Sequence, residues 1–211
     1  LDDPDLLEDE VWRIFELAPA KATINMGLDI TKIAAAYDPQ RAAANSWVYV
    51  LRDLSREGKL DRQRLLSASL GSLLRNTEAR NTVWFCRFHE FLEPTTEERR
   101  ARQETYLQLL SHPLPAVVEL ALDALNLVGK DERLDAPRLL AAIGPVFHLQ
   151  PKAQPLAAVR LLARECAANK HLAPQLAEVL IAGLAHPAPP VQGAILELLG
   201  KLRRPATVAV A

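Results

Sequence analysis

The chain has 211 residues, of which 49% are hydrophobic and 24% charged, so it can bury a substantial core and is not a disordered segment. Its net charge of −1 provides no overall field that would gather nucleic acid or an anionic membrane. Only 5% of the residues are aromatic and 8 are glycine, which favours helices over strands. These values predict an all-α protein.

Two cysteines, Cys86 and Cys166, are too few for a disulfide framework and favour a reducing compartment. The apolar stretches, such as "LAEVLIAGLA", are too short to span a membrane, and no signal peptide opens the chain. We therefore expect a cytoplasmic protein without a membrane partner. Because the sequence starts with Leu1 and stops at "RRPATVAVA", we interpret it as a fragment of a longer protein.

The first ten residues, "LDDPDLLEDE", include six acidic ones and indicate the solvated start of a helix or an acidic docking edge. Further along, "LDRQRLL" at 60–66 and "LDAPRLL" at 134–140 open two predicted helices, over 61–75 and 135–149. In each, an Asp is the expected N-cap and the leucines on either side form a hydrophobic staple. The caps and staples are Asp61 with Leu60 and Leu65, and Asp135 with Leu134 and Leu139.

Further patterns in the sequence mark the remaining helices and turns. Runs begin near Thr77 and Ala153, segments lie near 97–111 and 172–185, and two helices start at Pro115 and Pro189–Pro190. Gly58 and Gly129 indicate two helix ends. His112 and His186 stand beside prolines in two equivalent turns, and "EERRARQ", with Arg99, Arg100 and Arg102, is typical of a solvated helix face with Glu–Arg pairs.

The same pattern returns after 74 residues. Pro39, Pro113 and Pro187 have this spacing (113 − 39 and 187 − 113). The apolar triplet Trp47, Val48 and Leu51 aligns with Ala121, Leu122 and Leu125, and then with Ile195, Leu196 and Leu199. A helix pair cannot bury its apolar stripe alone, and two pairs of roughly 37 residues fill one period. The fold we predict is an α-solenoid of HEAT-like antiparallel helix pairs with a 74-residue double-unit period.

In this interpretation residues 1–211 form a single α-helical repeat domain. It comprises N-terminal helices over 1–59, tandem double helix-pair units over 60–133 and 134–204, and a tail over 205–211. The final helix, from about Val191 to Leu202, is expected to keep an apolar side that a further repeat would cover. That side would include Ile195, Leu198, Leu199 and Leu202.

Two resemblances support the helical-repeat interpretation. "HPAPPVQGAILELLGKL" resembles the second helix of a HEAT repeat, although Val118 and Gln192 stand where HEAT repeats often carry an arginine. "NSWVYVLRDLSREGKLDRQRLLSASLGSLL" followed by "WFCRFHEFLEPTTEERRARQETYLQLL" resembles an uncharacterised bacterial, largely actinobacterial, HEAT-like repeat family of unknown function, from about Leu1 to Val128. The most distinctive residues form the segment WFxRFHExLxPT: Trp84, Phe85, Arg87, Phe88, His89, Glu90, Leu92, Pro94 and Thr95.

The second resemblance implies no catalytic residue, because no activity is assigned to that family. Its members tend to lie near genes for a MoxR-type ATPase, a von Willebrand-A protein and a SWIM zinc-finger protein. It therefore implies a scaffold in an ATPase-linked system.

"WFCRFHEFLEP" is the strongest candidate for chemistry. Its aromatic residues and Leu92 share one arc of a helix, and Cys86, His89, Glu90 and Glu93 spread over the rest, which predicts a core helix with a polar back. A zinc site at Cys86 and His89 is rejected because zinc needs four ligands and no second pair exists. No glycine-rich phosphate loop occurs. We nominate no catalytic residue, no cofactor-binding residue, no metal ligand and no cofactor.

The function we expect is a non-catalytic protein–protein interaction scaffold, with protein partners and without nucleic acid. The alternative is a HEAT-like DNA-binding or DNA-glycosylase-type protein, for which segment 52–104 has 11 basic and 9 acidic residues, too balanced for a DNA footprint. A hydrolase whose nucleophile is assembled only in space is the third class. Neither the partner's identity nor the oligomeric state follows from the sequence.

Overall fold

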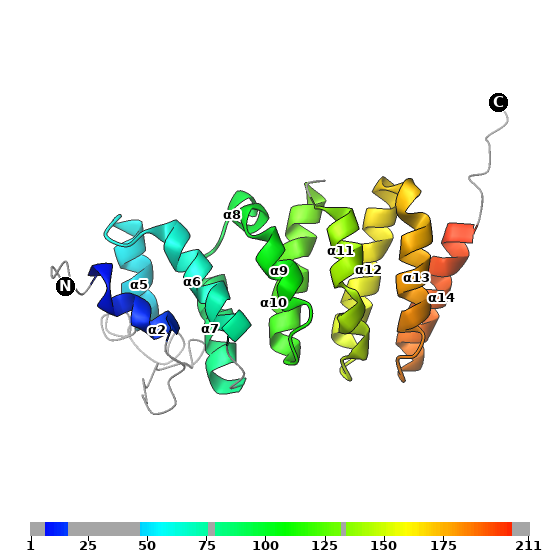
Figure 1. Cartoon of the computed structure of the whole chain (residues 1–211), viewed down its shortest axis with the longest axis horizontal. Coiled ribbons are helices and arrows are strands. Elements are labelled where there is room, and N and C mark those ends of the chain that lie inside the picture. Colours follow the sequence, from blue (N-terminus) through cyan, green and yellow to red (C-terminus); the bar gives the residue numbers. More distant parts are fainter. Residues whose placement is uncertain (1–6, 17–46, 76–78, 132–133, 204–211) are drawn as a thin grey trace, which may run out of the picture. The chain divides into compact units, whose positions relative to one another are not determined.

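The computed structural model describes residues 7–16, 47–75, 79–131 and 134–203 (Figure 1). Every regular element within these ranges is a helix, as the composition predicts. The residues group into two compact units, 1–95 and 96–211, here called the N-terminal and the C-terminal unit. The division after Thr95 differs from the boundaries expected for one repeat domain, which fall after residues 59, 133 and 204. None of the described helices is long and apolar enough to cross a membrane.

In the N-terminal unit, α6 is the central helix. Helices α2, α5 and α7 all contact it. Buried aromatic rings fill the space beside it, with Trp84 stacked on Phe88 at a centroid distance of 5.0 Å and Phe15 at 5.8 Å from Phe88. The elements are η1 Glu10–Trp12, α2 Arg13–Glu16, α5 Trp47–Arg56, α6 Arg62–Arg75 and α7 Ala79–Phe91.

The start of α6 has the predicted N-cap. The Arg64 backbone N–H donates to Asp61 Oδ1 at 2.7 Å, which satisfies one of the unpaired donors of the first turn. Leu60 and Leu65 on either side of the cap are buried, as expected for a hydrophobic staple. Local sequence alone therefore fixes where this helix begins.

The C-terminal unit is two rows of helices. Helices α9, α11 and α13 contact one another in succession, and so do α10, α12 and α14 (Figure 1). Across the rows, α9 contacts α10, η2 contacts α12, and α13 contacts α14. The elements are α8 Thr96–Ala101, α9 Gln103–Leu109, α10 Pro115–Lys130, α11 Ala136–Ala142, η2 Gly144–His148, α12 Ala153–Ala168, η3 Lys170–Leu172, α13 Ala173–Gly183 and α14 Pro189–Arg203.

Three predicted starts in this unit are confirmed. Helices α10 and α14 begin at Pro115 and Pro189, where the missing N–H of proline costs nothing. Asp135 caps α11 by accepting from the Arg138 N–H at 3.1 Å. The predicted end of that helix is wrong, because α11 stops at Ala142 and the short 3-10 helix η2 follows it. Pro145 explains the break, since its ring would clash with a carbonyl four residues earlier in a continuous helix.

The two predicted glycine stops have different outcomes. Gly58 follows α5 with a φ of +72°, a conformation that glycine adopts readily, so this stop is confirmed. Gly129 lies inside α10, and the predicted stop there is wrong. A Cβ at Gly129 would run into Arg164 Nη2 and lie 2.6 Å from Glu165 Oε1, so this glycine allows close packing of α12 on α10.

The "EERRARQ" segment is less solvated than expected. Arg99 and Arg102 are buried, and Arg100 forms an exposed pair, 3.6 Å from Glu97, as predicted. The helix is interrupted at Arg102, between α8 and α9. The Arg102 guanidinium donates to the Glu98 carbonyl at 3.1 Å. Long arginine stems can cover apolar surface while the charged head finds a polar partner.

Several sequence predictions fall outside the described residues. They are Asp2, Asp3 and Asp5 of the acidic start, the prolines at 39 and 205, the helix start near Thr77, and the tail 205–211.

Candidate interaction surface

The "WFCRFHEFLEP" segment comprises the second part of α7 and the three residues after it, and it serves mainly as core. Trp84, Phe85 and Phe88 are buried as predicted, and Phe91 packs edge-on against Tyr49 at 5.0 Å. The predicted polar back is only partly correct, because Cys86 is buried as well. The α7 helix is therefore enclosed over more of its circumference than a single apolar stripe would suggest.

His89, also assigned to the polar back, is completely buried. Its Nδ1 lies 2.8 Å from Ser69 Oγ on α6, and the Ser69 hydroxyl donates to the Leu66 carbonyl. With that hydroxyl hydrogen already used, Nδ1 of His89 is the donor to Ser69. The contact joins α7 to α6.

Among the described residues, no group of three or more His, Cys, Asp or Glu side chains could hold a metal ion. The Cys166 side chain lies outside the described residues.

The two turn histidines have the predicted architectural role. Nδ1 of His112 accepts from the Leu114 N–H at 3.1 Å, and Nδ1 of His186 accepts from the Ala188 N–H at 3.0 Å. In each turn the histidine ring therefore accepts a hydrogen bond from the backbone N–H two residues later, in place of a backbone carbonyl. His186 is buried, and its Nε2 donates to the Leu149 carbonyl at 2.9 Å.

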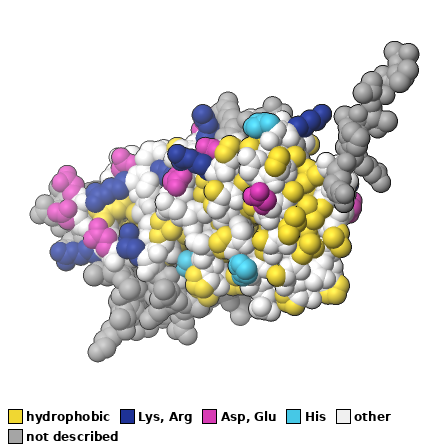
Figure 2. Space-filling view, turned by 45° about the vertical axis from the view of Figure 1, so that its right-hand side comes forward, with side chains coloured by type: hydrophobic (Ala, Val, Ile, Leu, Met, Phe, Trp, Pro, Cys, Tyr) yellow, Lys and Arg dark blue, Asp and Glu magenta, His cyan; other side chains and the backbone are white. Residues whose placement is uncertain are grey.

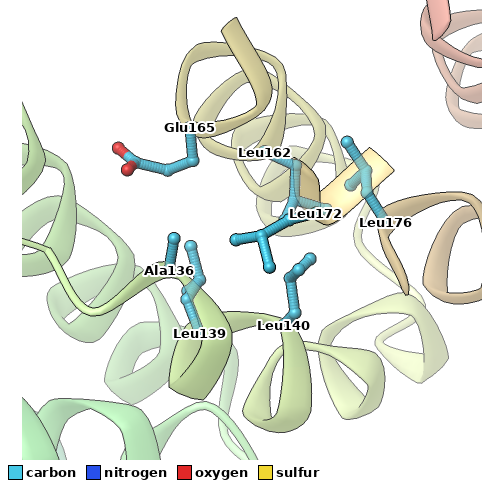
Figure 3. A pocket seen from close by; sticks show the side chains of 7 residues that line it. All are labelled: Ala136, Leu139, Leu140, Leu162, Glu165, Leu172 and Leu176. Atoms are coloured by element: carbon cyan, nitrogen blue, oxygen red, sulfur yellow. The ribbon is translucent and has the colours of Figure 1, made fainter. Parts of the chain in front are cut away.

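A small cavity between α11, α12 and α13 is a packing gap (Figure 3). It measures about 10 Å³, and Glu165 is its only polar lining residue, with a carboxylate that turns away from the leucine side chains. A buried water needs two to four polar partners, which this space does not offer. The lining residues are Ala136, Leu139, Leu140, Leu162, Glu165, Leu172 and Leu176.

The outer side of α13 and α14 carries a much larger hollow, here called the α13–α14 groove. It holds about 630 Å³, and no residue that lines it is charged. Ile181 is 59% exposed and Leu196 58% exposed. Figure 2 shows hydrophobic side chains gathered on the right of the view, where the C-terminal end of the chain is turned forward. The groove is lined by Ala173, Pro174, Ala177, Ile181, Leu196, Leu199, Gly200 and Leu202.

A charged pair lies beside the groove on α14. Lys201 Nζ is 2.7 Å from Glu197 Oε1, and this hydrogen bond and charge keep the pKa of Glu197 below its ordinary value. An apolar floor beside a charged, exposed edge is the usual anatomy of a protein–protein interface. Burying a side chain such as Ile181 or Leu196 fully is worth about 1.5–3 kcal/mol relative to exposure.

The sequence predicted an uncovered side on α14 but placed it incompletely. Ile195 and Leu198 are buried, while Leu199 and Leu202 are half-buried in the groove. Leu196 is an exposed large aliphatic residue of α14, and it was not among the residues expected on the uncovered side. A signal for the groove does exist in "LAEVLIAGLA", where apolar residues extend over more than one stripe of α13.

The 74-residue alignment pairs Leu125 with Leu199 and so predicts that both are buried, which is wrong for Leu199. Leu125 is completely buried, whereas Leu199 is half-buried. The reason is that α12 packs against α10, while no described element follows α14 on its outer side.

The described part of the chain is thus all-helical, and its C-terminal unit has two rows of helices and an open apolar groove. A family model for a domain of unknown function, DUF6493, matches residues 1–153, and the chain belongs to this family. The match covers the N-terminal unit and the C-terminal unit as far as the start of α12, and the groove lies beyond it. Searches of curated proteins and of solved structures gave no match.

Proposed function

We propose that this chain is a non-catalytic scaffold, an α-solenoid of HEAT-like helix pairs that binds other proteins. The observation that carries the proposal is the α13–α14 groove, with two large aliphatic side chains more than half exposed and no charged lining residue. Contiguous exposed apolar surface on a folded protein marks an interaction site.

The positions of the helix starts support a repeat with a 74-residue period. Four elements begin 74 residues before four others: α6 and α11 at 62 and 136, α7 and α12 at 79 and 153, α8 and η3 at 96 and 170, and α10 and α14 at 115 and 189. Helix pairs that recur at a fixed spacing stack on their neighbours and form extended binding surfaces.

The partner we propose is a MoxR-type ATPase or a von Willebrand-A protein. The support is the resemblance of the "WFCRFHEFLEP" region to a bacterial family whose members lie near genes for such proteins. A scaffold with an apolar groove fits a role in holding such an assembly together.

The test is affinity capture from cells that naturally contain the protein, followed by identification of the bound proteins. We expect a MoxR-type ATPase or a von Willebrand-A protein to be captured, and Leu196→Asp to abolish the capture. Leu127→Lys is the matched control, because Leu127 is a 37% exposed leucine on α10 at the position that Lys201 holds on α14. Capture that is unaffected by Leu196→Asp, or no ATPase or von Willebrand-A protein in the bound fraction, would contradict the proposal.

A further inference from the structure

We propose that the α13–α14 groove docks an antiparallel pair of amphipathic helices of the same kind as α11–α12. The pair would present an aliphatic side chain above Gly200. This inference rests on the proposed scaffold function and names the chemistry of the partner. It follows from a comparison between α13–α14 and the pair α9–α10, whose outer face is covered within this chain.

The stripe of α10 that faces α12 is marked by polar contacts. Asn126 Oδ1 accepts from Arg164 Nη1 of α12 at 2.6 Å, and Gly129 leaves room for the same guanidinium. Leu122 lies one turn before Asn126 on that stripe, since residues four apart share a face of a helix. Leu122 is 2% exposed.

The stripe of α9 that faces α11 is marked in the same way. Gln103 Oε1 accepts from the Asp135 N–H at 2.8 Å, and Glu104 pairs with Arg138 at 2.8 Å. Leu107 follows one turn later and is 4% exposed. Helices α9 and α10 thus contribute one stripe each to the contact with α11 and α12.

The same stripes recur on α13 and α14, where no helix pair among the described residues covers them. Seventy-four residues after Leu107 and Leu122 stand Ile181 and Leu196, which are 59% and 58% exposed instead of buried. Leu125 and Val128, both completely buried, correspond to Leu199 and Leu202 in the floor of the groove. The groove is therefore a helix-packing face that retains its apolar residues, and no described helix packs against it.

Two of the polar residues of the covered face are replaced by small ones, whereas Glu178 stands at the position of Glu104 and Arg203 at the position of Gly129. Ala177 stands at the position of Gln103, and Gly200 at the position of Asn126. A Cβ placed on Gly200 would meet no atom within 4 Å, so the space above it is open. With no acceptor there, an arginine such as Arg164 would lose the hydrogen bond that Asn126 accepts and keep only its contact with Glu165. An aliphatic side chain needs no acceptor, so the occupant we propose is aliphatic at that position.

The test extends the full chain by a helix pair in register. Residues 205–211 are replaced by a second copy of residues 131–168, with leucine at the copied position of Arg164. We expect the amides of α13 and α14 to exchange about tenfold more slowly in the extended protein than in the original chain, because a covered helix opens less often. The same extension on a Leu196→Asp host should leave exchange unchanged, whereas on a Leu127→Lys host it should give the full protection.

Two results would overturn the inference. One is an extended protein whose α13 and α14 amides exchange as fast as in the original chain, which would show that the face does not accept a helix pair. The other is a dimer of the original chain, seen by sedimentation, that Leu196→Asp dissociates and Leu127→Lys does not, which would make a second copy the occupant. If the extension protects α14 but the capture experiment finds no partner, the proposed function fails and this inference stands. If capture depends on Leu196 but the extension gives no protection, the proposed function stands and this inference fails.

Discussion

Arg164 on α12 donates a hydrogen bond from Nη1 to Oδ1 of Asn126 on α10, with an N–O distance of 2.6 Å. The guanidinium also contacts its neighbour Glu165 at 3.1 Å, and it passes over Gly129, where a side chain would collide with it. The contact between these two helices thus includes a polar bridge whose side-chain ends occupy the space that a Cβ at residue 129 would need.

Gly129→Ala should lower the free energy of unfolding of the C-terminal unit by about 0.5–1.5 kcal/mol, because the new Cβ displaces the Arg164 guanidinium from its hydrogen bond to Asn126. This is the opposite of the effect expected in an open helix, where alanine is favoured over glycine by about 1 kcal/mol. Gly193→Ala on α14 is the control, because a Cβ there meets nothing within 4 Å, and it should stabilise the protein. Urea unfolding followed by circular dichroism measures both. Equal effects of the two substitutions would show that Gly129 has no packing role.

His186→Ala should destabilise the C-terminal unit because it removes the partners of two backbone groups. The Ala188 N–H and the Leu149 carbonyl would both lose a hydrogen bond in a partly buried turn. The loss is worth about 1–3 kcal/mol for each group left unsatisfied. His186→Asn should cost less, since an asparagine oxygen can still accept from an N–H two residues later. Thermal unfolding compares the variants, and an Asn variant as unstable as the Ala variant would contradict this account of the turn.

The two aspartate caps should act on separate helices. Asp61→Ala should cost about 0.5–2 kcal/mol through α6, and Asp135→Ala a similar amount through α11. Asparagine at either position should restore most of the loss, because its side-chain oxygen accepts the same N–H. Hydrogen exchange resolved by helix is the measurement. Faster exchange spread evenly over both units after either substitution would mean that the caps are not local determinants.

Leu125→Ala and Leu199→Ala should have different effects, although the proposed 74-residue repeat places the two residues at equivalent positions. Leu125 is completely buried, so its truncation should cost about 2–5 kcal/mol. Leu199 is half-buried in the groove and should cost clearly less. Chemical unfolding of both variants decides this, and equal losses would indicate that α14 is covered as α10 is.

Sequence reasoning succeeded where the signal is local. An Asp before an apolar run caps its helix at Asp61 and Asp135, and proline opens α10 and α14, because these effects involve only the first helical turn. The turn role of His112 and His186 is local in the same sense. Such features can be predicted without knowledge of the packing.

Sequence reasoning failed where packing against another helix determines the role or the burial of a residue. Gly129 resembles a helix stop in the sequence, but its role comes from Arg164, 35 residues later. The burial of Arg99, Cys86 and His89 likewise depends on helices packed against them. The end of α11 before Pro145 is different, because proline rarely continues a helix and this signal is local. The exposure of Leu196 required knowing that no described element follows α14.

The most direct test of the account compares two leucines that stand 74 residues apart. Leu122→Cys and Leu196→Cys are made separately in a chain whose Cys86 and Cys166 are replaced by alanine, and the rate of reaction with a thiol reagent is measured. We predict that Cys at 196 reacts at least about a hundredfold faster than Cys at 122, which becomes accessible only when the helices open. Equal rates at the two positions would contradict the assignment of the α13–α14 groove as an exposed helix-packing face.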